Sequence, residues 1–244
     1  MASADRYDVS IIGTGPAGLT AGIFTARGGL DTLLVGDGES TLARNAHLEN
    51  VPGFPAGVSA RRFLDMTLDQ AIRNGCEHRT ATVTRLSTNA DGFEIETSDG
   101  IVESDAVICA SWGDSGYLAD LEDISLTTRG SKTYVDTGPD GETDVDGLYV
   151  AGRLARKRHQ TVVSAGDGAN VALALLEASA VPFYHDWVAP EGYFTERRRE
   201  IPPGCEEIDD EERERREKEA MREMRERFSE PHPSEPNQHP DVPG

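Results

Sequence analysis

The sequence predicts an α/β fold in which a parallel sheet, an antiparallel meander and covering helices form three layers, followed by a charged C-terminal helix. Near the N-terminus, short apolar runs alternate with a segment of helical periodicity, as parallel strands covered by helices do. In the middle of the chain the apolar period changes to two, which indicates antiparallel strands. With 244 residues, the chain is long enough for one large domain or two small ones.

The first predicted elements make a strand–helix–strand unit. Residues 7–12 form a largely apolar run that ends at a glycine, and residues 16–27 place Leu19 and Ile23 four apart on one helical face. Residues 32–35 supply a second buried strand. Parallel strands joined in this way require helical cover on the sheet.

The rest of the body follows from the same two periodicities. Residues 60–74 have helical spacing, with Gly75 as a C-terminal cap. The other expected elements are a meander from residue 80 to about residue 101, strands at 106–110 and 148–151, and a helix at 164–178.

Composition divides the chain into four segments. We expect a Rossmann-like body over residues 1–182, a linker over 183–205, a charged helix over 206–228 and a disordered tail over 229–244. Prolines and glycines interrupt the linker, Glu and Arg recur at helical spacing in the third segment, and the tail holds five prolines. The stripe of Met221, Met224 and Phe228 on the charged helix could dock on the body or on a second copy.

The charge is strongly negative. The chain has 24 Lys and Arg against 44 Asp and Glu, a formal charge of −20, which disfavours nucleic acid and anionic membrane surfaces as partners. Only three of the bases are lysines, and this acidic, lysine-poor composition resembles that of proteins from salt-loving archaea. No apolar run is long enough for a signal peptide or a membrane span, so we expect a soluble, cytoplasmic protein.

The spacing of the three cysteines predicts no metal or redox site. Cys76, Cys109 and Cys205 are far apart and form no C-x-x-C, so neither a zinc site nor a local redox disulfide is predicted, and the sequence indicates no other metal site.

The glycine loop is the motif with the clearest chemistry. Gly13, Gly15 and Gly18 make a G-x-G-x-x-G that follows a strand and opens a helix, which is typical of dinucleotide-binding folds. The glycines permit a tight turn and close approach, and the helix N-terminus offers N–H groups to a diphosphate. The alternative is a glycine-rich turn that binds nothing. In such folds an acidic residue that binds the ribose is expected about 20 residues later, near position 36. Here position 36 is a glycine and the acid follows it as Asp37, which could equally belong to a turn.

Several segments, in order, resemble the low-molecular-weight thioredoxin reductases. Besides the glycine loop, Glu49-Asn50-Val51-Pro52-Gly53-Phe54-Pro55 resembles a segment that lies against the flavin in that family. Residues 126–152 resemble the approach to the family's second FAD motif, and residues 160–169 resemble the helix that caps the flavin ring. The resemblance covers roughly residues 7–178.

That resemblance implies FAD as cofactor. The residues it implies as cofactor contacts, together with those of the glycine loop, are Gly13, Gly15, Pro16, Ala17, Gly18, Asp37, Asn50, Ser111, Gly152, Arg153, Gln160, Thr161 and Asp167. Trp112 stands where the family has a glycine, and Arg153 where it has an aspartate that bonds the ribityl chain. Arg153 could instead reach the diphosphate as a fork.

The resemblance stops short of a complete reductase. The family inserts an NADPH-binding domain with a C-x-x-C after the strand at 106–110, whereas this chain returns to flavin-like sequence by about residue 124. We therefore expect an FAD-dependent oxidoreductase whose electrons come from a separate protein or small donor. A partner, a second copy or the C-terminal extension could cover the flavin. The alternative is a dinucleotide-binding or interaction protein that has lost catalysis. No catalytic residue is predicted.

Overall fold

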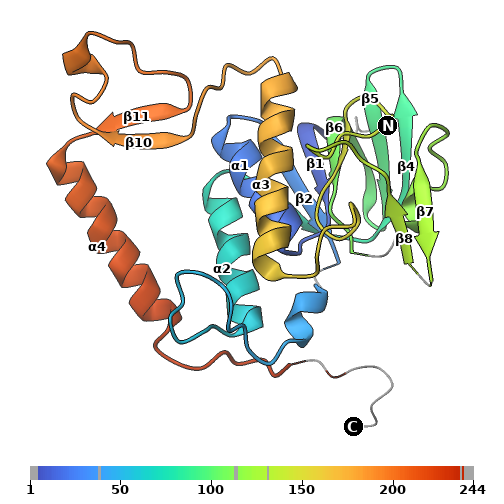
Figure 1. Cartoon of the computed structure of the whole chain (residues 1–244), viewed down its shortest axis with the longest axis horizontal. Coiled ribbons are helices and arrows are strands. Elements are labelled where there is room, and N and C mark those ends of the chain that lie inside the picture. The colour runs from blue at the N-terminus through green and yellow to red at the C-terminus, as the bar shows by residue number, and fades with distance from the viewer. Residues whose placement is uncertain (1–4, 38–39, 113–114, 131, 237, 239–244) are drawn as a thin grey trace.

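The computed structural model describes residues 5–37, 40–112, 115–130, 132–236 and 238. A seven-stranded sheet carries helices on one face, and a segment of two short strands and a helix, residues 187–227, extends away from this body (Figure 1). We call this segment the arm. The strand order is β3-β2-β1-β6-β5-β4, with β9 also paired to β6. The strands are β1 (Asp5–Ile12), β2 (Thr32–Gly36), β3 (Glu77–Thr80), β4 (Val83–Asn89), β5 (Gly92–Thr97), β6 (Gly100–Cys109) and β9 (Leu148–Val150). The predicted α/β architecture, with its parallel sheet and meander, is confirmed.

Strand β6 joins the parallel and antiparallel parts of the sheet. Along one edge it pairs parallel with β1; along the other, its first half pairs antiparallel with β5 and its last residues pair parallel with β9. The sequence predicts two strands here, one near Ile101 and one at 106–110. The structure has one, because the apolar residues Val102, Val107 and Ile108 are all buried in a single continuous pairing with β1.

Three helices cover one face of the sheet: α1 (Pro16–Arg27), α2 (Ala60–Arg73) and α3 (Thr161–Ala178) (Figure 1). Glycines allow α1 to approach its neighbours closely. A Cβ on Gly18 would lie 1.9 Å from the carbonyl oxygen of Gly13, and a Cβ on Gly168 would lie 2.1 Å from that of Ala17. Both distances are impossible for a larger residue, so these glycines fix the start of α1 against the turn that precedes it and against α3.

The sheet separates two apolar cores. On the helical side, Ile11, Leu34 and Ile108 pack with residues of α1 and α3. On the other side, Phe93 and Leu148 pack with residues around the short helix η2 (Gly116–Leu118). The hairpin of β7 (Leu126–Arg129) and β8 (Lys132–Val135) borders this second core through Val135. A smaller cluster holds the loop that runs from η1 (Thr41–Arg44) to α2.

The segment expected to be a linker contains strands. Within residues 183–205 the chain forms β10 (Trp187–Pro190) and the short helix η3 (Thr195–Arg197), and β11 (Cys205–Ile208) pairs parallel with β10. Aromatic rings pack beside β10, with the ring centroids of Trp187 and Tyr193 4.5 Å apart. This local aromatic packing gives the segment order that its prolines and glycines did not predict.

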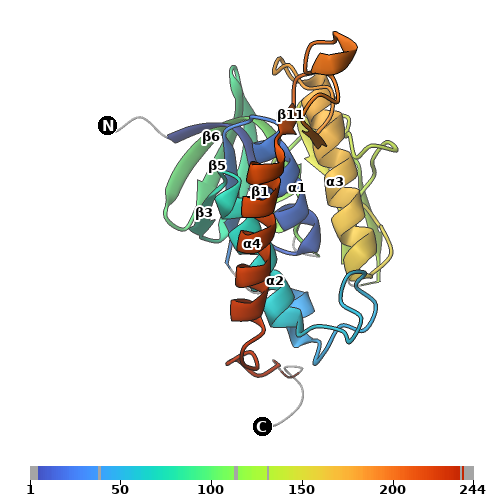
Figure 2. The same ribbon diagram turned by 90° about the vertical axis from the view of Figure 1, so that its left-hand side faces the viewer.

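The charged helix α4 (Asp210–Arg227) starts four residues later than expected because β11 takes the preceding residues. Figure 2 shows α4 crossing in front of α2. Its C-terminal end is tied to α2 by ion pairs from Arg73 to Glu223 at 2.8 Å and from Arg227 to Asp69 at 2.5 Å. Phe228 of the apolar stripe docks on the body, since its ring centroid lies 6.1 Å from that of Phe54.

The described part of the tail also meets the body. His232 Nε2 lies 2.8 Å from a carboxylate oxygen of Asp65 on α2. Residues 229–236 form no helix or strand. Among the described residues, no helix is both long enough and apolar enough to cross a membrane.

Candidate functional site

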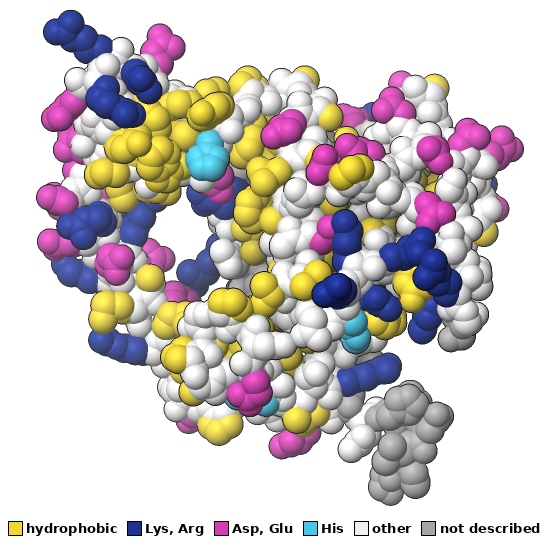
Figure 3. Space-filling model, viewed as in Figure 1, with side chains coloured by type: hydrophobic (Ala, Val, Ile, Leu, Met, Phe, Trp, Pro, Cys, Tyr) yellow, Lys and Arg dark blue, Asp and Glu magenta, His cyan; other side chains and the backbone are white. Residues whose placement is uncertain are grey.

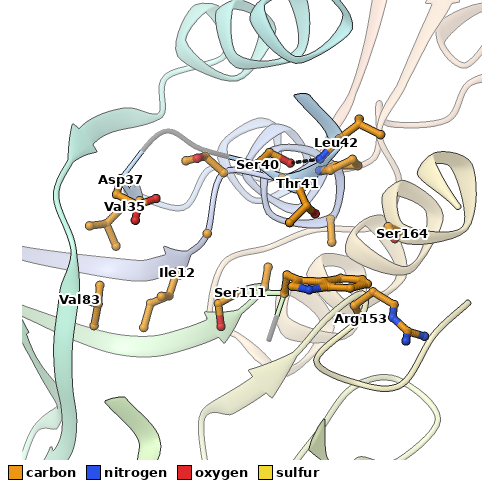
Figure 4. Close-up of a pocket in the computed structure, with 18 of the residues that line it drawn as sticks. Ile12, Val35, Asp37, Ser40, Thr41, Leu42, Val83, Ser111, Arg153 and Ser164 are labelled. Carbon is orange, nitrogen blue, oxygen red and sulfur yellow. Dashed lines mark hydrogen bonds between the residues drawn. The ribbon is translucent and has the colours of Figure 1, made fainter. Parts of the chain in front are cut away.

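A cavity of about 280 Å³ opens where the parallel strands β1, β2 and β6 end. The chain order reverses between β1 and β6, and ligands of open α/β sheets bind in the crevice at such a point. Figure 4 shows an elongated site, with Asp37 and Val83 toward one end and Arg153 and Ser164 toward the other.

The glycine loop lines this cavity beside the start of α1. Gly13 has a φ of +112°, and a Cβ there would lie 2.8 Å from the Ala110 carbonyl, so glycine is required. Gly15 differs, because a Cβ on it would come no closer than 3.4 Å to Ser40 Oγ. No side chain caps α1, and its first turn holds Pro16 and no acidic residue. The first N–H groups of α1 and the positive end of its dipole are therefore available to an anion in the cavity.

Asp37 lies at the other end of the cavity, directly after β2. Its carboxylate is solvent-exposed and stands at the end of the second parallel strand, where dinucleotide-binding folds place the acid that contacts a ribose hydroxyl. The neighbouring wall is formed by residues 40–42, in which Ser40 Oγ accepts a hydrogen bond from the Leu42 N–H at 3.3 Å.

A stack of aromatic and basic side chains closes the cavity end near α3. The ring centroids of Trp112 and His159 are 4.3 Å apart, and the Arg153 guanidinium carbon lies 5.0 Å from the Trp112 ring centre. The same guanidinium lies 5.6 Å from the Tyr134 ring centre. We call these four residues the Trp112 stack; cation–π attraction favours Arg153 between its two rings.

Arg153 is directed away from the glycine loop (Figure 4). It donates to the Lys157 carbonyl oxygen at 2.8 Å and to the Tyr134 hydroxyl at 3.2 Å. The fork that the sequence analysis considered between Arg153 and a diphosphate would require these contacts to break. Burial, followed by the positive charge of Arg153, lowers the pKa of His159 below its ordinary value, so the imidazole is predominantly neutral at pH 7.

The structure divides the sequence-derived contact residues into two groups. Those that line the cavity are Gly13, Gly15, Pro16, Ala17, Asp37, Ser111, Arg153, Gln160 and Thr161. Those that do not are Gly18, Asn50, Gly152 and Asp167.

The second group has contacts of its own. The Asn50 side-chain amide donates to Gln160 Oε1 at 2.7 Å, which links the 49–55 loop to the start of α3. The Asp167 side chain is 8% exposed; it accepts from the Gly152 N–H at 2.7 Å and pairs with Lys157 at 3.0 Å. Asp167 thus fixes the loop that carries Arg153.

Sequence reasoning missed part of the cavity wall. Ala81, Thr82 and Val83 line it because the short strand β3 brings the chain back beside β2. Strand β3 is polar and none of its four residues is fully buried, so no apolar pattern marks it. Tyr117 also lines the cavity, and its hydroxyl lies 2.8 Å from Ser111 Oγ.

The site suits the ADP half of FAD better than the flavin half. The uncapped start of α1, the open face of Gly15 and the carboxylate of Asp37 suit the diphosphate and ribose of the ADP half. At about 280 Å³ the cavity is just below the roughly 300–1,000 Å³ usual for small-molecule sites. Its volume suits one nucleotide half, so the flavin half would have to extend past the Trp112 stack toward Asn50.

Comparison with known proteins agrees with the fold. No family model matches the chain. The thioredoxin reductase of Aquifex aeolicus is 38% identical over 96 residues, which are 38% of this chain and 30% of that protein. The thioredoxin reductase of Listeria monocytogenes is 29% identical over 191 residues, 69% of this chain and 50% of that protein. A solved thioredoxin reductase from Gloeobacter violaceus superposes with a TM-score of 0.63 at 20% identity, covering 75% of this chain and 100% of the other.

These two relatives and this structural neighbour are all named thioredoxin reductases, as is a solved structure from Lactococcus lactis. Another neighbour is the ferredoxin-flavin thioredoxin reductase from Clostridium acetobutylicum, with a TM-score of 0.58 at 17% identity, covering 71% of this chain and 97% of the other. The fold is therefore the Rossmann-like fold of thioredoxin reductases. The chain spans between 30% and 50% of the length of the Aquifex and Listeria relatives.

Proposed function

We propose that the cavity at the start of α1 binds FAD, and that the chain is an FAD-dependent oxidoreductase whose electrons come from a separate donor. The observation that carries this proposal is the uncapped N-terminus of α1, which faces the cavity beside Gly15. Asp37 stands at the ribose position, at the end of the next parallel strand. The thioredoxin-reductase fold of the relatives supports FAD as the dinucleotide.

Bound FAD would accept electrons from a donor and pass them to an acceptor, and the protein would supply position and electrostatics. In this proposal the N–H groups at the start of α1 hold the diphosphate and Asp37 accepts from a ribose hydroxyl. The linked amides of Asn50 and Gln160 orient the end of the site toward which the ring extends.

A separate donor is supported by what the 244 residues contain. They include one G-x-G-x-x-G loop and no C-x-x-C. Burial also raises the pKa of the Cys109 thiol, which directly precedes the cavity-lining Ala110, to about 12, so it is a poor nucleophile. The Clostridium neighbour is named a ferredoxin-flavin thioredoxin reductase, and by analogy with that name we propose a protein as the donor here.

Spectroscopy of the purified protein tests the proposal. We expect flavin absorbance in protein loaded with FAD, reduction by a chemical reductant, and no rapid bleaching when NADPH or NADH is added anaerobically without a partner. Rapid bleaching by a nicotinamide nucleotide alone would contradict the need for an outside donor. Failure to take up FAD would contradict the flavoprotein assignment itself.

The Trp112 stack favours a second candidate: a nucleotide-binding protein without redox activity. Trp112 and Arg153 narrow the site at the end where a flavin ring would extend. This candidate expects ADP to bind as tightly as FAD, because the ring would add no contacts. Tighter binding of FAD than of ADP, together with reversible reduction of the bound flavin, would exclude it.

A further inference from the structure

A group of basic side chains lies beside the mouth of the cavity, in a chain that is otherwise strongly acidic. Figure 3 shows dark-blue side chains gathered over the region of the β7–β8 hairpin and the loop before α3. We define the basic patch as Arg129, Lys132, Arg153, Arg156, Lys157 and Arg158.

Backbone pairing and side-chain contacts hold the patch together. Arg129 and Lys132 face each other in the register of the hairpin, and the Val135 N–H at the end of β8 bonds to the Leu154 carbonyl at 3.0 Å. Arg153 then reaches across to Tyr134 of β8. The two basic segments, far apart in sequence, therefore form one surface.

The charge of the patch is poorly neutralised. Among the described residues, two carboxylates pair with it: Asp136 with Arg156 at 3.1 Å, and the nearly buried Asp167 with Lys157 at 3.0 Å. Six bases against these two acids leave four positive charges in surplus, although the whole chain carries −20. The patch also contains two of the three lysines in the chain.

The patch adjoins the candidate site. Arg153 belongs both to the patch and to the wall of the cavity, and His159 follows Arg158 directly. Val162 and Val163, at the start of α3, are 42% and 40% exposed. Basic side chains beside exposed apolar ones are the composition of a protein-docking surface whose charged rim steers the partner.

We propose that the basic patch docks a small protein with an acidic surface, which serves as the redox partner of the cofactor site. This inference rests on the proposed function for the role of the partner, but not for the docking itself. Charge complementarity selects the occupant: an acidic protein is attracted by the patch, whereas the net charge of −20 on the whole chain repels it, so the patch favours its approach to the side of the molecule that holds the cavity.

The net charge argues for a protein rather than a nucleic acid. A polyphosphate strand is long and uniformly charged, so it would extend from the patch onto the acidic remainder of the molecule. A small folded protein can present its acidic face to the patch alone. The surplus of four charges is also modest beside the six to ten phosphate contacts typical of duplex-binding proteins.

Binding to acidic probe proteins tests the inference. The probes are an oxidised plant-type ferredoxin and a flavodoxin, both acidic, with cytochrome c as a basic control and a single-stranded oligonucleotide as a polyphosphate control. Affinity is measured for the FAD-loaded full chain by calorimetry in about 20 mM and about 300 mM NaCl, which differ strongly in Debye length. The patch variant carries Arg129→Glu, Lys132→Glu and Arg158→Glu.

The matched control variant carries Arg199→Glu, Lys218→Glu and Arg225→Glu, which change the same number of exposed charges away from the patch. We expect at least one acidic probe to bind at low salt, and the patch variant to lose roughly tenfold or more in affinity while the control variant loses much less. Equal losses in both variants would overturn the inference, as would binding of neither acidic probe or tighter binding of the oligonucleotide.

The two proposals fail in distinguishable ways. If the chain takes up no FAD but the apoprotein binds an acidic probe through the patch, the docking surface stands and the flavoprotein assignment falls. If FAD binds and neither acidic probe does, the reverse holds.

Discussion

Trp112 stacks on His159 with a centroid distance of 4.3 Å at the α3 end of the cavity. One ring follows the end of β6 and the other precedes α3, so the contact joins two elements on either side of the site. Trp112 places a large indole at a position where the family that this chain resembles has a glycine. In the proposed FAD complex, the position of this ring would set how much of the dinucleotide the cavity encloses.

Replacing Trp112 by alanine should open this end of the cavity. We expect Trp112→Ala to bind FAD roughly tenfold more tightly, about 1.4 kcal/mol, and to leave the affinity for ADP unchanged, because in the proposed complex only the flavin half would extend past the stack. Calorimetric titration with the two ligands measures the difference. Trp187→Ala, on the arm, is the control. Equal changes for FAD and ADP would show that Trp112 does not stand at the flavin end.

The ionisation of His159 reports on the stack. Partial burial, followed by the charge of Arg153, lowers its pKa, so NMR titration should place the midpoint below the ordinary histidine value of 6.5. Arg153→Gln should raise the pKa, because it removes the neighbouring positive charge. Since the folded pKa lies below the unfolded one, this contribution to stability is present above the unfolded pKa and is lost as the pH falls. A midpoint unaffected by Arg153→Gln would contradict the contact.

The three thiols should differ in reactivity. Burial raises the pKa of Cys76 and of Cys109 to about 12, whereas Cys205 is partly exposed on the arm. At pH 8 a disulfide reagent should therefore modify one thiol of the native protein, and Cys205→Ser should abolish that reaction. All three thiols should react in denaturant. Rapid modification of Cys109 in the native protein would contradict its burial.

The sequence predicted the body of the fold well because its signals are local. The strand at 7–12, the helix at 16–27 and the glycine loop follow from periodicity and from residue types that one backbone geometry requires. Strand β3 was missed because it is polar, short and at the sheet edge. The arm was missed because its order depends on contacts among aromatic rings and Glu207 rather than on periodicity.

The cavity was only partly predictable for a related reason. The residues of the glycine loop could be placed from one motif, but the direction of Arg153 depends on Tyr134 and the Lys157 carbonyl, which belong to other segments. Asp167 matched the family pattern, yet its carboxylate faces Gly152 and Lys157 instead of the cavity. A motif specifies residue types, whereas tertiary contacts decide where each side chain points.

The arm should loosen in acid through Glu207. Partial burial opposes ionisation, but hydrogen bonds from the N–H groups of Phe194, Thr195 and Gly192 and from the Thr195 hydroxyl lower the Glu207 pKa to about 2. Its stabilisation is therefore present above the unfolded value of 4.5 and is lost as the pH falls toward about 2.

Fluorescence of Trp187 measures this loss when Trp112→Phe removes the other indole. We expect a transition between pH 4.5 and about 2. Glu207→Gln should loosen the arm already at neutral pH and abolish that transition, whereas Glu191→Gln, in the same segment, should leave it in place. An unchanged acid transition in Glu207→Gln would assign it to another group.

Titration of FAD into Gly15→Val tests the account most directly. A Cβ on Gly15 meets no atom closer than 3.4 Å and the residue has an ordinary backbone conformation, so the variant should fold, while its branched side chain occupies the place of a diphosphate at the start of α1. Gly166→Ala, whose Cβ would lie in open space on α3, is the control. The account predicts FAD binding by the parent protein and by Gly166→Ala, and a loss of roughly a hundredfold or more, about 2.7 kcal/mol, in folded Gly15→Val. Undiminished FAD binding by Gly15→Val would contradict a cofactor site at the amino end of α1.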